Sequence, residues 1–220
     1  LKKTESIDVM DSLGSNIRID SRGTEVQRIL PRLNEEINEE WISDKARFSY
    51  DGLKTQRIDR PYVRYNGKLE PSSWEDAFFH IKQNLQALKG HQIAAIAGDL
   101  ADCESLLCLK ELMKKLGSNN LECRQDGSKL DGNTRVSYLF NSTIAGIEKT
   151  DAILIIGSNP RTEAPVLNAR IRKRFTSGEA KIGLIGEKVD LTYKYSFLGN
   201  TPYLLESLLE KTSKFGKVIR

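Results

Sequence analysis

A five-residue apolar run that stops at a glycine-containing loop limits the folds open to this chain more than any other feature. Ala152–Ile156 is continuously apolar, which is typical of a strand covered on both faces, and Gly157-Ser158-Asn159-Pro160 follows at once. A helical stretch from about Ala164 to Phe175 comes next, and Ile182–Ile185 is typical of another buried strand. Strands that alternate with helices in this way predict an α/β fold, a parallel sheet with right-handed crossovers.

The same alternation extends to both sides of this run. We expect further strands at 93–97, buried on both faces, and at 121–123, and further helices at 74–88, 102–116 and 204–215. Ser72-Ser73 ahead of Trp74 is a typical N-cap, and Gly90 and Gly117 are expected to end the first two of these helices.

The N-terminal region has a different pattern. Apolar and polar residues alternate between 5 and 30, with turn signals between them, which predicts three short strands. Residues 33–47 show no long amphipathic period, so we expect an irregular segment held in place by Trp41 and Phe48. The sequence therefore predicts a small β-rich region, residues 1–70, and an α/β Rossmann-like domain, residues 71–220, cut before its end.

Composition excludes several classes of protein. The 220 residues carry a net charge of +4 with 39% apolar and 29% charged residues, as in a soluble globular domain. A bilayer span needs about 20 apolar residues, and the longest apolar runs here have five, so no span is expected. The chain begins Leu-Lys-Lys without Met, and we expect it to be a fragment of a longer polypeptide.

Cysteine and histidine are too few for a metal centre. Cys103, Cys108 and Cys123 form no C-x-x-C motif, whereas a structural zinc or iron–sulfur site needs about four close ligands. We expect Cys103 and Cys108 to be small buried hydrophobes in a helix. His80 and His91 have no recognisable acid–base partner and are expected to be structural.

The loop after the 152–156 run is the candidate binding site, because ligands of open parallel sheets lie at the carboxyl ends of strands. Gly157, Ser158 and Asn159 could bring backbone N–H groups to a phosphate, and Arg161 could add charge. Neither dinucleotide nor P-loop glycine motifs occur, so an ordinary turn between strand and helix is the alternative.

A basic cluster follows this loop. The window 161–174 contains five cations and one carboxylate, which could bind nucleic acid, form a protein interface or be a solvated helix face. The cations are Arg161, Arg170, Arg172, Lys173 and Arg174.

Several long strings resemble one family, the G-chain or mitochondrial 75 kDa-type subunit of respiratory complex I, NADH:quinone oxidoreductase. They lie in residues 6–18, 28–35, 38–45, 60–64, 143–146 and 157–173. The resemblance implies a molybdopterin-oxidoreductase-like domain, similar to formate dehydrogenase, placed after an iron–sulfur part of the subunit.

In the molybdenum enzymes this region begins with cysteines that hold a [4Fe–4S] cluster. The resemblance places those ligand positions approximately on Ser6, Val9, Leu13 and Ser43, none of which is cysteine. It also implies that the 157–160 loop corresponds to a loop near the nucleotide part of the molybdopterin cofactor, with no molybdenum ligand recognisable here. We therefore expect no metal and no cofactor in this chain, and a vestigial pocket formed by Gly157, Ser158, Asn159 and Arg161.

By resemblance, the whole subunit takes part in electron transfer from NADH through [2Fe–2S] and [4Fe–4S] clusters to quinone, coupled to proton translocation. This chain is expected to be a non-catalytic structural domain of the peripheral arm. Its partners would be other peripheral-arm subunits, with Arg170 to Arg174 as the docking cations. The location would be the cytoplasmic or matrix face of an energy-transducing membrane. The alternative is a molybdopterin-type fragment that still binds a guanine nucleotide.

Overall fold

The computed structural model describes residues 1–123, 132–178, 180–210 and 215–217, and it divides the chain into two compact units. The first combines residues 1–54 with 135–220, and the second comprises residues 55–134. The β-hairpin of the second unit spans position 70, where the sequence predicts a boundary; that division into 1–70 and 71–220 stays a prediction.

The N-terminal part of the first unit is an antiparallel three-stranded sheet in the order β1-β2-β3, which confirms the three predicted strands. The strands are β1 Lys2–Ile7, β2 Asn16–Arg22 and β3 Glu25–Pro31. Ile17 on β2 is buried against Ile42 and Ala46, and Ala46 lies on the short helix α1, Asp44–Phe48. The alternation of β2 puts the apolar Ile17 and Ile19 on its inner face.

Asp20 is a fully buried carboxylate on β2 that is paired with two arginines. Its oxygens lie 2.9 Å from Arg18 Nε and 2.7 Å from Arg28 Nε. These hydrogen bonds hold the pKa of Asp20 below its ordinary value of 3.8.

We therefore expect the Asp20 ion pairs to stabilise the fold above pH 3.8 and to lose that effect as the pH falls below it. The Asp20→Asn variant should be less stable at neutral pH and should lose less stability than the wild type on acidification. Urea unfolding at neutral and acidic pH measures this, and parallel losses in both proteins would contradict it.

The segment after β3 is held by a buried asparagine rather than by aromatic residues. Trp41 and Phe48 are 57% and 59% exposed, so the prediction that they hold this segment is wrong. Asn38 is fully buried. Its amide nitrogen donates to the carbonyls of Arg32 and Trp41, each at 3.0 Å, and its amide oxygen accepts from the Asn16 N–H at 2.9 Å. A single side chain that hydrogen-bonds to the backbone produces no periodic pattern in the sequence.

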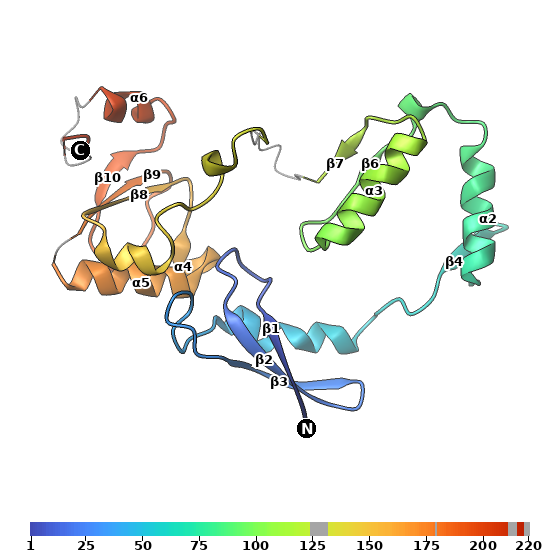
Figure 1. The fold of residues 1–220 in the computed structure, drawn as a ribbon, viewed down its shortest axis with the longest axis horizontal. Coiled ribbons are helices and arrows are strands. Elements are labelled where there is room, and N and C mark those ends of the chain that lie inside the picture. The colour runs from blue at the N-terminus through green and yellow to red at the C-terminus, as the bar shows by residue number, and fades with distance from the viewer. Residues whose placement is uncertain (124–131, 179, 211–214, 218–220) are drawn as a thin grey trace. The chain divides into compact units, whose positions relative to one another are not determined.

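The second unit contains a hairpin, two helices and a small parallel pair of strands (Figure 1). The predicted N-cap of α2 is confirmed, because Ser73 accepts from the Asp76 N–H. Asp102, which was not predicted as a cap, accepts from the Ser105 N–H in the same way. The elements are β4 Tyr62–Tyr65, β5 Lys68–Pro71, α2 Trp74–Leu85, β6 Ala95–Ile96, α3 Cys103–Lys115 and β7 Leu121–Glu122.

Three expectations for this unit are wrong. Helix α2 ends at Leu85, ahead of Gly90, which instead begins a 3₁₀ turn where an added Cβ would collide with the Gly117 carbonyl. The strand expected at 93–97 has two residues, and Ile96 is 77% exposed because β6 pairs with β7 in a two-stranded sheet. Cys103 and Cys108 are exposed, and the buried residue of α3 is Met113.

The C-terminal part of the first unit is the parallel sheet β10-β9-β8 with helices beside it, which confirms the α/β prediction (Figure 1). Leu184 on β9 and Leu191 are fully buried in its core, together with Ile155, Ile171 and Ile182. The elements are β8 Ala152–Ile156, α4 Pro160–Glu163, α5 Pro165–Thr176, β9 Lys181–Ile185, β10 Ser196–Gly199 and α6 Leu204–Leu209.

The predicted strands at 152–156 and 182–185 and the helix from 164 are confirmed, but β10 was not predicted. Four residues with two apolar side chains are too short to give a pattern. The last helix ends at Leu209, whereas residues 211–214 of its predicted span lie outside the described residues. No helix in the described part of the chain is long and apolar enough to cross a membrane.

Candidate functional site

The loop after β8 lies at the carboxyl ends of β8 and β9. Gly157 adopts a positive φ of 62° and donates its N–H to the Ile185 carbonyl at 2.8 Å. Gly186, which follows β9, has a φ of 138°, and an added Cβ there would come within 3.3 Å of the Gly157 backbone. The two glycines let the two loops pass each other closely, which brings the 157–163 loop to the predicted edge of the sheet.

A carboxylate of the loop itself takes the backbone N–H that a phosphate would use. The Glu163 carboxylate accepts from the Asn159 N–H at 2.8 Å and from the Ser158 hydroxyl at 2.7 Å. These hydrogen bonds, the Asn159 one foremost, lower the pKa of Glu163, so it stays ionised at neutral pH. Sequence reasoning missed Glu163, which is the fourth residue after the N-cap Asn159 and therefore lies one position beyond the capping-box spacing.

Arg161, the cation predicted for a ligand, is paired within the protein. Its Nη1 lies 2.6 Å from Asp190 Oδ2 and 3.2 Å from the Asp190 carbonyl oxygen. The Asp190 pKa is lowered, first by the Thr192 N–H and then by Arg161.

A small pocket of about 150 Å³ opens beside this loop. It is lined by Gly157, Ser158, Asn159, Glu163, Glu187 and Val189. With two carboxylates and no cation in its lining, the pocket repels phosphate groups. The residues therefore do not fit the nucleotide part of a molybdopterin cofactor.

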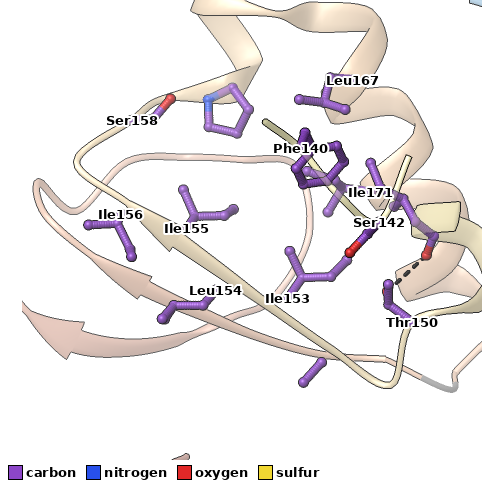
Figure 2. Close-up of a pocket in the computed structure, with 13 residues that line it drawn as sticks. Phe140, Ser142, Thr150, Ile153, Leu154, Ile155, Ile156, Ser158, Leu167 and Ile171 are labelled. Atoms are coloured by element: carbon purple, nitrogen blue, oxygen red, sulfur yellow. Dashed lines mark hydrogen bonds between the residues drawn. The ribbon is translucent and has the colours of Figure 1, made fainter. Parts of the chain in front are cut away.

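A larger cavity of about 330 Å³ lies along β8 (Figure 2). Its walls come mainly from Ile153, Leu154, Ile155 and Ile156 on β8 and from Leu167 and Ile171 on α5, with Phe140 among the labelled side chains. None of its lining residues is titratable, so it offers no acid, base or metal ligand. Sequence reasoning missed this cavity because its walls combine separate segments.

The positions that the resemblance assigns to cluster ligands have other roles. Val9 is 62% exposed, Leu13 is 6% exposed within the apolar core, and Ser6 is half-buried on β1. Ser43 is the buried N-cap of α1, with its hydroxyl accepting from the Ala46 N–H at 3.2 Å. The three cysteines are at 103, 108 and 123, so residues 1–51 contain no thiolate and do not fit a [4Fe–4S] cluster. Over the described residues, no cluster of three or more His, Cys, Asp or Glu could hold a metal ion.

Because Ser43 caps α1, we expect Ser43→Ala to lower the free energy of unfolding by about 1 kcal/mol. Ser43→Asp retains an acceptor at the cap and should recover part of that loss. Urea unfolding compares the three proteins, and an unchanged midpoint in Ser43→Ala would contradict the capping role.

Two arginines of the basic run on α5, Arg170 and Arg174, face the protein interior. Arg170 is 2% exposed and Arg174 is 8% exposed, so the prediction that Arg170 to Arg174 dock neighbouring subunits is wrong for these two. Arg170 Nε donates to the Ile37 carbonyl at 3.1 Å, and its Nη2 donates to the Glu35 carbonyl. Its Nη1 lies 2.7 Å from Glu148 Oε1.

Lys173 extends this cluster. Its Nζ lies 2.6 Å from Glu39 Oε1 and 3.1 Å from Glu148 Oε1, and these contacts raise its pKa. The acidic run before α1 is therefore bound to α5 within the first unit. Arg172 remains exposed on the same helix.

Two family models match the sequence of this chain. The sequence model described as molybdopterin oxidoreductase matches residues 57–219, which is most of the chain. The chain belongs to the molybdopterin oxidoreductase family. A second model, described as the NADH-ubiquinone oxidoreductase NDSU1/NuoG-like 4Fe-4S domain, matches residues 1–51.

Similar proteins match this chain over its whole length. The G subunit of NADH-quinone oxidoreductase from Rickettsia conorii is 54% identical over 220 residues, which are 100% of this chain and 33% of that protein. The mitochondrial 78 kDa subunit of NADH-ubiquinone oxidoreductase from Neurospora crassa is 51% identical over all of this chain and 30% of its own length. The mitochondrial NADH dehydrogenase [ubiquinone] iron-sulfur protein 1 of Solanum tuberosum is 46% identical over all of this chain and 30% of its own length. These matches confirm the resemblance to complex I subunits, and the chain spans about a third of the length of these relatives.

Proposed function

We propose that this chain is a non-catalytic structural domain within the G-type, or 75 kDa-type, subunit of NADH-quinone oxidoreductase. The support is the similarity of the whole chain to such subunits in bacteria and mitochondria. The molybdopterin-type fold would supply shape and rigidity to the peripheral arm, while its ancestral cofactor sites have no role.

One observation carries the non-catalytic assignment: Glu163 occupies the N–H at Asn159 in the loop where the family places its nucleotide. A phosphate at this position would have to displace an ionised carboxylate and lie beside Glu187. The absence of cysteine from residues 1–51 supports the same assignment for the cluster position.

The activity of the intact protein is proposed to lie outside these 220 residues. We infer that the subunit takes part in electron transfer from NADH to quinone, coupled to proton translocation, through [2Fe–2S] and [4Fe–4S] clusters held elsewhere in it. Its partners would be other peripheral-arm subunits. Its place would be at the cytoplasmic or matrix face of the inner membrane, peripheral and held there by those subunits.

Elemental analysis and absorption spectroscopy of the purified chain, residues 1–220, test this proposal. We expect a folded, colourless protein without iron or molybdenum, no saturable binding of GDP, and no NADH–ferricyanide turnover. Circular dichroism first establishes that the sample is folded. Stoichiometric molybdenum, or GDP binding that weakens about tenfold in Arg161→Ala, would instead make the 157–163 loop a working nucleotide site.

A further inference from the structure

The loop between β1 and β2 contains buried oxygen atoms without partners. Its two ends are joined by a hydrogen bond from the Asp8 N–H to the Ser15 carbonyl at 2.8 Å. Asp8 is 4% exposed and Ser15 is 1% exposed. Asp8 Oδ2, Asp11 Oδ2 and Ser15 Oγ are shielded from solvent and have no hydrogen-bond partner in the described part of the chain. Buried polar atoms in native proteins are nearly always paired, so three in one eight-residue loop mark it as a candidate binding site.

The other oxygen of each carboxylate is fixed by the backbone. Asp8 Oδ1 accepts from the Met10 N–H at 2.9 Å, and Asp11 Oδ1 accepts from the Leu13 N–H at 2.9 Å. Both side chains are thus held in place while one oxygen of each stays available.

A lysine of the protein lies near these carboxylates. Lys45 interacts electrostatically with Asp8, but its Nζ donates to the Met10 carbonyl at 3.3 Å and not to either free carboxylate oxygen. The two carboxylates, with Lys45 as the cation that interacts with Asp8, give the loop a net negative charge. A phosphate or other anion is therefore excluded as the ligand.

We propose that the Asp8–Ser15 loop binds a hard divalent cation of the calcium type through Asp8 Oδ2, Asp11 Oδ2 and Ser15 Oγ. Carboxylate, hydroxyl and water oxygens are the ligands that such cations prefer. Calcium accepts irregular arrangements of six to eight oxygens, whereas Mg²⁺ demands a near-ideal octahedron. With two carboxylates, the site falls in the weak class of calcium loops. The cation would close the segment that contains the former cluster positions Val9 and Leu13, independently of the proposed function.

Calorimetry of the full-length protein after chelator treatment tests this site. We expect Ca²⁺ to raise Tm in a saturable way, with half-saturation at about 10⁻⁴ to 10⁻³ M. Mg²⁺ should act more weakly. Loss of a mere outer-shell partner weakens metal sites by about 10- to 100-fold, so Asp8→Asn and Ser15→Ala should each weaken Ca²⁺ binding by at least about tenfold. Asp99→Asn, the same substitution at an exposed aspartate of the second unit, should leave it unchanged.

The proposal is overturned if Ca²⁺ produces no saturable shift in Tm. It is also overturned if the Tm shift is the same in the wild type, Asp8→Asn and Ser15→Ala, as expected if ordered water alone fills the loop. Stronger binding of Mg²⁺ than of Ca²⁺ would overturn the calcium-type assignment. Ser15→Ala removes only a hydroxyl, so it decides the question if Asp8→Asn fails to fold.

Discussion

Replacing Arg170 by methionine is expected to lower the free energy of unfolding by about 3 kcal/mol. The change keeps an unbranched side chain but leaves the carbonyls of Glu35 and Ile37 without their donor and Glu148 without its buried partner. Removing one member of a buried charged network costs much more than the network contributes relative to apolar packing. Urea unfolding of the variant and the wild type measures the difference.

Arg172→Met is the matched control for this prediction, because Arg172 is an exposed arginine of the same helix. We expect it to change stability by less than about 0.5 kcal/mol. Arg170→Lys should stay destabilised, since an ammonium cannot replace the three directed contacts of the guanidinium. Equal effects of the changes at 170 and 172 would show that the Arg170 contacts contribute nothing specific.

Leu184→Ala is expected to cost about 2–5 kcal/mol, the range for leucine truncation in a tightly packed core. Leu184 is fully buried on β9, in one core cluster with Ile155, Ile171 and Leu191. The truncation removes apolar contacts and leaves a cavity that a strand flanked by two neighbours cannot close by moving. The midpoint of thermal unfolding, followed by circular dichroism, should fall accordingly.

The control for the core variant is Leu209→Ala on α6, where the leucine is 83% exposed. Both variants remove the same atoms, so their difference isolates the effect of burial. We expect Leu209→Ala to stay within about 0.5 kcal/mol of the wild type. A loss in Leu184→Ala no larger than in Leu209→Ala would contradict the assignment of Leu184 to the core.

Elements that local rules control could be predicted from the amino-acid sequence without coordinates. Continuous apolar runs indicated β8 and β9, Ser73 indicated the beginning of α2, and alternation indicated the N-terminal sheet. Caps, turns and periodicity act over a few residues, so each leaves a signal within a short window. The sequence also has no cysteine in residues 1–51, which excludes a cysteine-ligated iron–sulfur cluster in that region.

In contrast, the contacts that the charged residues make could be seen only in the folded chain. As a string, the cations of α5 indicate an external surface, yet Arg170 reaches carbonyls more than 130 positions away and is buried by them. Glu163 accepts the Asn159 N–H, and within the described residues Asp8 and Ser15 keep buried oxygens without a partner in one loop. Whether a polar group meets solvent, a partner or a buried void depends on segments distant in sequence, because the free energy of burying a charge is set by all of its neighbours.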